Sequence, residues 1–260
     1  MINIFILIIS IVFITFTIGA LVAITIKNTS IIDVWWALGP FVTAWICLWT
    51  FSGNELHIIF CILISMLSLR LGLFLLFTRI FKKKQDERYS VIESKWKGNK
   101  HIKTIGHFYM QAAFNCLLCI TYIPLFNLTS TSLSHLYIIS IILFSISLFG
   151  VTIADLQLYK FKEKNNTGLC KQGLWSICRH PNYFFEWLAW TSLALFVFIH
   201  TSSILAWSAP LSLFIIMRFM TGPYTEKLSL QKRKIEYKEY QKTVPMFFPS
   251  LRLIIKGVLK

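Results

Sequence analysis

The stretch 173-GLWSICRHPNYFFEWLAWTSLALFVFIH-200 changes from polar residues to a long apolar run, and it places Glu186 inside that run. A helix of about 20 apolar residues is long enough to cross the hydrocarbon layer of a bilayer. A carboxylate within such a helix is costly and is usually paired or functional. We therefore expect a membrane-spanning helix whose entrance, at 179–186, carries the chemistry of the protein.

The composition extends this interpretation to the whole chain. Hydrophobic residues make up 56% and charged residues only 14%, whereas charged residues are about 25% of a soluble domain. We expect an all-α, polytopic membrane bundle of about seven helices. The predicted spans are 2–26, 31–51, 57–80, 106–127, 135–158, 181–200 and 203–221. The first has no basic n-region and no small-x-small cleavage pattern, so we expect it to be retained.

The positions of Lys and Arg predict the orientation in the membrane. Of the 26 Lys and Arg residues, 24 lie in the loops, the tail or, for Arg79, at the very end of a span, and all 24 fall on one side of a seven-span arrangement. The alternate loops 52–56, 127–135 and 200–203 contain none. Because loops rich in Lys and Arg remain in the cytoplasm, we expect the N-terminus outside and the C-terminus in the cytosol.

The remaining features of the sequence indicate one membrane domain, 1–260, with a cytosolic tail at 222–260. The net charge of +15 follows from this orientation and from attraction to anionic membrane lipids, so no nucleic-acid partner is expected. Cys116 and Cys119 form a CxxC pattern inside an apolar helix with no neighbouring His or acid, and we predict no metal site. Neither of the usual glycine-rich nucleotide motifs is present.

Five ionisable residues lie in or at the edge of the spans. They are Asp33, Arg70, Asp155, Glu186 and Arg218. Such residues usually face the interior of a bundle or an aqueous cavity, so they indicate either a functional site or structural ion pairs. Both alternatives remain open from the sequence. By their depth in the spans, we expect them to converge on one region that is open to the cytosol.

The entrance segment predicts a site for a ligand with both anionic and polar groups. Pro181 suits the first position of a helix. Arg179, His180 and the unpaired N–H groups of the first turn would attract a phosphate. Asn182 and Glu186, deeper on the helix, would bond a polar ring or amide.

Two further segments fit this design. One is 153-IADLQLYKFK-162, in which Asp155, Tyr159 and Lys162 share a helix face. The other is the tail, where Glu226, Arg233, Tyr237 and Tyr240 recur at intervals that predict an amphipathic helix. That helix either contributes to the site or lies on the membrane surface without a ligand.

These segments resemble the bacterial membrane proteins of the steroid 5-alpha-reductase-like family. The resemblance covers about residues 30–250, and RHPNYFxE and EYxxYQxxxxxFxP are its most specific patterns. It implies a seven-helix enzyme of the bacterial inner membrane that binds NADPH from the cytosol. Such an enzyme would reduce an activated C=C bond of a lipid-like enone that arrives from the bilayer.

The resemblance also assigns site residues. It implies cofactor contacts at Arg70, Asp155, Lys162, Arg179, His180, Asn182, Glu186, Arg233, Tyr237 and Tyr240. It points to Asp33 and Tyr183 as catalytic residues. Phe185 stands where the family commonly has Gly, which would crowd the cofactor or reshape the pocket.

An alternative resemblance leads to different chemistry. The isoprenylcysteine carboxyl methyltransferases also carry an RHPxY segment and a similar tail, and they use S-adenosylmethionine on a lipidated substrate. The pairing of Asn182 with Glu186 and the ADLQLYKFK segment favour the reductase. A transporter would need inverted repeats or broken spans, which the sequence lacks.

Overall fold

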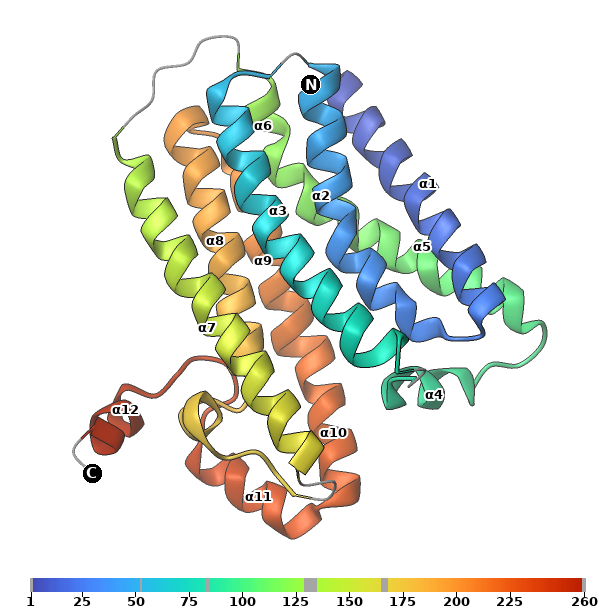
Figure 1. The fold of residues 1–260 in the computed structure, drawn as a ribbon, viewed down its shortest axis with the longest axis vertical. Coiled ribbons are helices and arrows are strands. Elements are labelled where there is room, and N and C mark those ends of the chain that lie inside the picture. Colours follow the sequence, from blue (N-terminus) through green and yellow to red (C-terminus); the bar gives the residue numbers. More distant parts are fainter. Residues whose placement is uncertain (1, 52, 83–84, 129–134, 165–167, 259–260) are drawn as a thin grey trace. The chain divides into compact units, whose positions relative to one another are not determined.

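A computed structural model describes residues 2–51, 53–82, 85–128, 135–164 and 168–258. Throughout these ranges the chain forms helices and loops, with no strand (Figure 1). Seven helical segments are long and apolar enough to span a membrane: Ile2–Ile26, Thr29–Thr50, Glu55–Ile80, Lys100–Phe126, Tyr137–Lys164, Pro181–Thr201 and Ile204–Lys232. The predicted all-α membrane fold is confirmed. The predicted outer loop 127–135 lies largely outside the described residues.

By its internal contacts the chain divides into two compact units. Unit 1 comprises Met1–Tyr137 and Leu193–Ser212, and unit 2 comprises Ile138–Ser192 and Leu213–Lys260.

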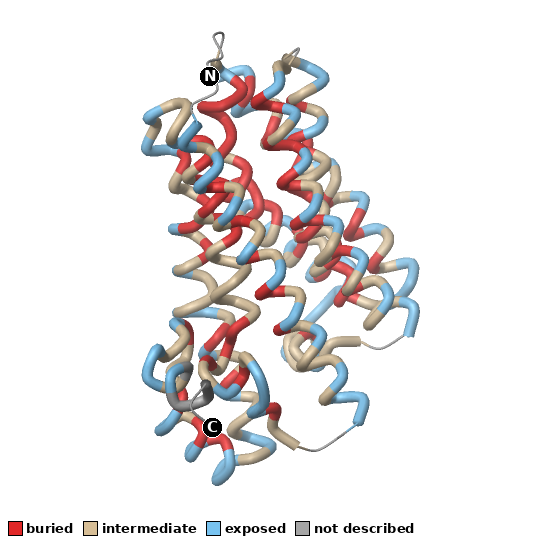
Figure 2. The backbone as a smooth tube through the Cα atoms, turned by 60° about the vertical axis from the view of Figure 1, so that its left-hand side comes forward, coloured by how far each residue is buried: buried red, intermediate tan, exposed pale blue. Residues whose placement is uncertain are grey.

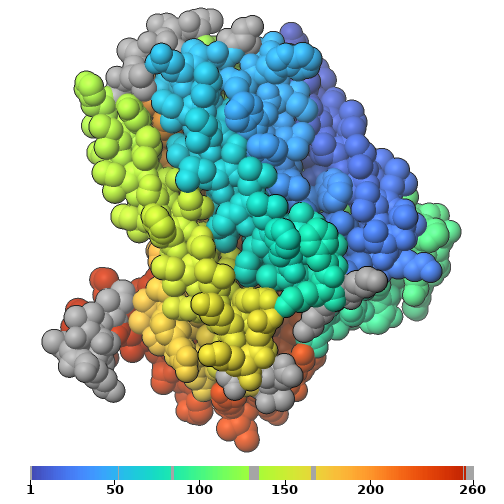
Figure 3. Space-filling view, viewed as in Figure 1, coloured from blue at the N-terminus to red at the C-terminus, as the bar shows by residue number. Residues whose placement is uncertain are grey.

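Unit 1 is built on four helices that pack against one another: α1 (Ile2–Ile26), α2 (Ile32–Thr50), α3 (Glu55–Leu75) and α5 (Lys100–Cys119). Figure 3 shows α1, α2 and α3 side by side on one face. It also contains two short helices, α4 (Glu87–Glu93) and α6 (Ile123–Phe126), and the second half of α8 (Pro181–Thr201). Many large apolar side chains of α1, such as Ile6, Ile14 and Leu21, are exposed. In Figure 2, buried and exposed residues alternate within the turns of the long helices, as expected for helices with one face on lipid.

A proline inside α2 leaves one main-chain carbonyl without its helical hydrogen bond, and a side chain of another helix replaces that bond. Pro40 has no N–H, so it leaves the carbonyl of Trp36 without its helical donor. The fully buried Asn115 of α5 supplies the missing bond through Nδ2, 3.0 Å from the Trp36 oxygen. Gly39 permits this approach, since a Cβ there would lie 2.5 Å from Asn115 Oδ1.

Unit 2 contains α7 (Tyr137–Lys164) from Ile138 onward and the first half of α8 (Pro181–Thr201). It also contains the end of α9 (Ser208–Ile215), α10 (Gly222–Lys232), α11 (Lys234–Thr243) and α12 (Leu251–Val258). A π-helical segment, Ile216–Thr221, joins α9 to α10. The seventh span therefore continues as a helix to Lys232, well past its predicted end at 221.

The predicted amphipathic helix of the tail is divided into two helices. The backbone leaves helical geometry at Arg233, where φ is −143° and ψ is 58°. Glu226 therefore belongs to α10, while Tyr237 and Tyr240 belong to α11. Both tyrosines are buried in a small apolar cluster with Val244. They face the interior of unit 2 and not a membrane surface.

The loop between α7 and α8 is fixed onto α7 by a glycine turn. Gly173 has φ of +56°, a conformation that favours glycine. A Cβ at this position would lie 2.2 Å from Gln157 Nε2. Gln157 Oε1 accepts a bond from the N–H of Leu174 at 3.0 Å, and Trp175 Nε1 donates to the carbonyl of Ala154 at 3.0 Å.

Candidate functional site

The two residues before α8 are bonded to the tail through the main chain. The N–H groups of Arg179 and His180 donate to the carbonyl oxygens of Pro245 and Met246, at 2.9 and 3.2 Å. The helix then begins at Pro181, as predicted, where the missing N–H costs nothing. The position of the helix entrance therefore depends on the tail.

A buried ion pair reinforces this connection. Arg179 Nε donates to Glu226 Oε1 at 2.7 Å, and Nη2 donates to Oε2 at 3.3 Å. Arg179 Nη1 donates to the carbonyl oxygens of Val244 and Gln241, at 2.5 and 3.2 Å. Gln241 Nε2 also donates to Glu226 at 2.7 Å, and His180 Nε2 lies 3.2 Å from the same carboxylate. We call Arg179, His180, Glu226 and Gln241 the Arg179 network; it joins α8, α10 and α11.

His180 connects the Arg179 network to the first turn of α8. Its ring stacks on that of Tyr183, with centroids 5.1 Å apart and an interplanar angle of 9°. His180 is 5% exposed, whereas Tyr183 is only half-buried. The stacking fixes the ring of Tyr183, and the predicted catalytic role of this residue stays a prediction.

Asn182 has a buried acceptor atom that no described residue satisfies. Its Nδ2 donates to Asp155 Oδ1 at 3.2 Å. Because a carboxylate only accepts hydrogen bonds, this contact fixes the orientation of the amide. The Oδ1 atom is buried and lacks a hydrogen-bond partner among the described residues. An unsatisfied acceptor costs about 1–3 kcal/mol, so this atom fits the N–H or O–H donor of a ligand.

Phe185 occupies space that a glycine provides. A Cβ on Gly150 of α7 would lie 2.4–2.6 Å from three carbons of the Phe185 ring. The ring also packs edge-on against Phe184, with centroids 5.1 Å apart. The Phe185 side chain of α8 therefore packs against α7 at Gly150, the position where α7 has no side chain.

The two predicted tail tyrosines hold α11 in place. The Tyr240 hydroxyl donates to the carbonyl of Trp175, in the turn before α8. Burial raises the pKa of both Tyr237 and Tyr240, so these phenols remain protonated donors at physiological pH. Lys162 lies in the last turn of α7, and Arg233 lies at the break between α10 and α11.

The comparisons with known proteins are informative about the family. The family described as "Protein of unknown function (DUF1295)" matches residues 20–244. The chain belongs to the DUF1295 family. Among curated proteins, "Uncharacterized protein C594.04c" of Schizosaccharomyces pombe is 40% identical over 88 residues, which are 34% of this chain and 24% of the yeast protein. The alignment thus spans about a quarter of the length of that relative. No solved structure matches the chain.

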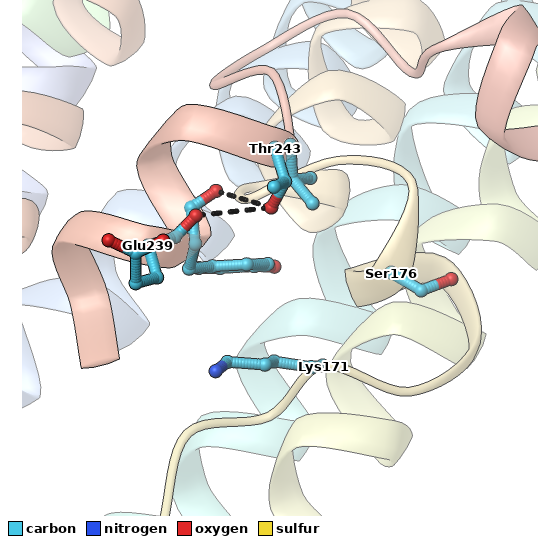
Figure 4. A pocket seen from close by; sticks show the side chains of 6 residues that line it. Lys171, Ser176, Glu239 and Thr243 are labelled. Atoms are coloured by element: carbon cyan, nitrogen blue, oxygen red, sulfur yellow. Dashed lines mark hydrogen bonds between the residues drawn. The ribbon is translucent and has the colours of Figure 1, made fainter.

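A shallow pocket of about 230 Å³ opens beside α11 in this DUF1295 protein. In Figure 4, Lys171 and Ser176 approach it from the loop before α8, and Glu239 and Thr243 from α11. The Thr243 hydroxyl is bonded to carbonyls of its own helix. Ligand pockets usually measure about 300–1,000 Å³, so this pocket suits a small group only.

The predicted catalytic residue Asp33 lies in unit 1, in a second ion network. Asp33 Oδ2 accepts bonds from Arg79 Nη1 and Arg88 Nη2, each at 2.7 Å, and the Tyr89 hydroxyl donates to Oδ1. Asp86 lies 2.9 Å from Arg79 and 3.0 Å from Arg88. Burial acts to raise the pKa of Asp86, but Arg88 and Arg79 outweigh it and hold this pKa below its usual range. We call these five residues the Asp33 network.

The structure brings most, but not all, of the predicted site residues into one unit. Asp33 and Arg70 belong to unit 1. The other ten belong to unit 2: Asp155, Lys162, Arg179, His180, Asn182, Tyr183, Glu186, Arg233, Tyr237 and Tyr240.

The sequence did not predict that Glu226 and Gln241 would bond to each other and that Glu226 would be the counter-ion of Arg179 in unit 2. A signal for Glu226 was available, because the chain has only 11 Asp and Glu residues. An arginine at the edge of a span needs one of these few acids as its counter-ion.

Proposed function

We propose that this DUF1295 protein is a membrane-embedded reductase that uses NADPH to reduce an activated C=C bond of a lipid-like enone. The proposal combines the resemblance of its RHPNYFxE and EYxxYQxxxxxFxP segments to the steroid 5-alpha-reductase-like family with the chemistry of unit 2. The observation that carries it is the buried Oδ1 atom of Asn182, which has no hydrogen-bond partner among the residues that the structure describes.

The acceptors on α7 and α8 suit an uncharged group that carries N–H. Asp155 and Asn182 are bonded to each other, and Glu186 follows Asn182 by four residues on the same helix face. Carboxylates repel phosphate but accept bonds from an amide nitrogen. A nicotinamide carboxamide would donate one N–H to Asn182 Oδ1. Its diphosphate would lie toward Lys162 and the first-turn N–H groups of α8.

The residues of the chain have distinct tasks in this reaction. When bound, NADPH supplies the hydride that is added to one carbon of the double bond. The enone oxygen then needs a proton donor or a hydrogen bond where negative charge develops. We assign this task to Tyr183, whose ring is held by His180. We favour it over Asp33, because the carboxylate of Asp33 already accepts from two arginines and Tyr89.

The ring of Phe185, placed on Gly150, would narrow the space beside the acceptors on α8. We therefore expect this site to take a substrate slimmer than a steroid. The substrate would enter from the bilayer as a hydrophobic small molecule.

Ligand-dependent thermal stability distinguishes this proposal from S-adenosylmethionine-dependent methyl transfer. Protein purified in detergent should gain stability with NADPH and not with S-adenosylmethionine, since only a ligand bound to the folded state stabilises it. The Asn182→Leu variant removes the unpartnered acceptor and should weaken NADPH binding by about tenfold, within the usual cost of one lost hydrogen bond. Thr191→Val, on the same helix, is the matched control and should bind normally. Stabilisation by S-adenosylmethionine alone would establish the rival.

The orientation of the chain is part of the proposal. We propose that the C-terminus lies in the cytoplasm, because the loop Lys and Arg residues fall on one side. From the resemblance to bacterial membrane proteins, we also propose that the protein resides in a bacterial inner membrane. Alkaline phosphatase inserted after Gly53 should be active, whereas the same enzyme inserted after Gly98 should be inactive. Equal activity at both positions would refute the orientation.

A further inference from the structure

The last helix of unit 2 presents apolar side chains that no described residue covers. Leu251 and Ile255, four residues apart on one face of α12, are 75% and 59% exposed. Phe248, just before the helix, is 51% exposed. In Figure 1, α12 is the last helix of the chain and follows an extended segment.

The opposite side of α12 packs against its own unit. Leu253 contacts the buried cluster of Tyr237, Tyr240 and Val244. At about 100° per residue, Leu253 lies roughly opposite Leu251 and Ile255. The packing of Leu253 therefore turns the exposed pair outward.

The N-terminus of α12 lies close to the residues that precede the spanning helix α8. The N–H of Ser250 donates to the carbonyl of Ile177 at 3.0 Å. Ile177 precedes by four residues Pro181, the first residue of a predicted membrane span. Since four residues cover only a short distance, α12 begins at the edge of the apolar layer and not deep in the aqueous phase.

The segment before α12 already reaches the apolar layer. The ring of Phe247 packs against Trp187 of α8, with centroids 5.9 Å apart, and against Phe214 of α9, at 5.3 Å. Both partners lie within membrane-spanning helices. The partly exposed ring of Phe248 contacts the same two rings, with centroids 5.8 Å from Trp187 and 6.1 Å from Phe214. α12 therefore begins close to residues of the spanning helices.

The charge of α12 matches the surface of a membrane. Arg252 is exposed beside the apolar pair, and the sequence 251–260 contains three basic residues and no acidic one. Helices with one apolar face and basic residues at its border lie in the headgroup region of anionic bilayers.

We propose that α12 is an interfacial membrane anchor: Leu251 and Ile255 enter the lipid layer beside the entrance of α8, and Arg252 binds anionic lipid headgroups. This anchor is independent of the proposed reductase activity. It holds the tail, which is bonded to Arg179 and His180, at the membrane surface.

A fluorescent label at position 255 tests the anchor. All six native cysteines are buried, so a maleimide dye that is sensitive to polarity should react selectively with the Ile255→Cys variant of the full chain. In phosphatidylcholine vesicles containing phosphatidylglycerol, we expect blue-shifted emission that is quenched by lipids with a shallow nitroxide. The same dye in the Lys238→Cys variant, on the exposed face of α11, should show neither effect.

The contribution of Arg252 is measured in the labelled protein. Removing one basic charge with Arg252→Gln should lower the ratio of docked to undocked label about fivefold in anionic vesicles. The matched variant Lys238→Gln should leave this ratio unchanged. Emission at position 255 equal to that at position 238 would refute the anchor. So would a blue shift without lipid quenching, which would mean that protein covers the helix, or quenching only by deep nitroxides.

Discussion

The Arg179 network and the Asp33 network both place arginine next to carboxylate, but they differ in burial and in charge balance. The side chains of Arg179 and Glu226 are 10% and 9% exposed. Those of Asp33, Arg79, Asp86 and Arg88 are 17–31% exposed. The first network has one carboxylate for its arginine, whereas the second has two carboxylates shared between two arginines.

The difference in charge balance determines whether removal of one residue leaves another charge without a counter-ion. If Arg179 is removed, Glu226 is left as a buried charge with only neutral or weakly basic partners. If Asp33 is removed, both arginines of the other network still have Asp86. We therefore expect the Arg179 network to be much more sensitive to substitution.

The largest effect should follow from Arg179→Leu. Leaving one member of a buried ion pair alone costs about 3–5 kcal/mol, so thermal unfolding in detergent should occur at a much lower temperature. Arg179→Leu combined with Glu226→Leu removes the stranded charge and should recover part of this loss. If the double variant were no more stable than the single one, the carboxylate would not be the source of the cost.

A smaller effect is expected from Asp33→Asn. The amide still accepts from Tyr89 or one arginine, and Asp86 still pairs with both arginines. The loss should therefore be about 1.5–3 kcal/mol, as for one charged hydrogen bond. The same thermal unfolding experiment measures it. A loss as large as that of Arg179→Leu would contradict the comparison.

The Asp33 network should also weaken in acid. The pKa of Asp86 is lower in the folded protein than in the unfolded chain, so its stabilising contribution is present above the unfolded pKa. It is lost as the pH falls below about 4 toward the folded value. The stability difference between wild type and Asp86→Asn should therefore shrink as the pH falls below about 4. A difference that does not change with pH would show that this carboxylate does not titrate as described.

The smallest effect should come from an exposed pair. Lys171 lies 3.2 Å from Glu236, and their side chains are 42% and 43% exposed. Lys171→Ala should change stability by less than about 1 kcal/mol, because solvent screens such pairs. A larger loss would indicate that the ring of Tyr240, 6.0 Å below the Lys171 ammonium, contributes more than the ion pair.

The spans were predictable from sequence, but several of their ends were not. Apolar runs show which residues cross the hydrocarbon layer, but a helix can continue beyond the edge of that layer. α7 extends to Lys164 beyond the predicted 158, and the seventh span extends to Lys232 beyond 221. The polar residues in these extensions keep helical hydrogen bonds in water as well as in lipid, so hydropathy gives no signal for where they stop.

The candidate site was predictable where its residues share one helix and not where they come from distant segments. Helical spacing placed Asn182 and Glu186 together at the entrance of α8. No spacing rule pairs Arg179 with Glu226, which lies 47 residues away. The helical spacing of Glu226, Tyr237 and Tyr240 gave no sign of the break at Arg233. A periodic pattern of side chains is compatible with one residue that leaves helical geometry.

The main-chain bonds that fix the entrance of α8 also constrain the order in which the protein can be made. The N–H groups of Arg179 and His180 bond to the carbonyls of Pro245 and Met246, and the spanning segment Ile204–Lys232 lies between the two partners of each bond. When α8 leaves the ribosome and enters the membrane, its tail partners have not yet been synthesised. Arg179 and His180 must therefore remain solvated, or be shielded by the insertion machinery, until the tail emerges and closes over them.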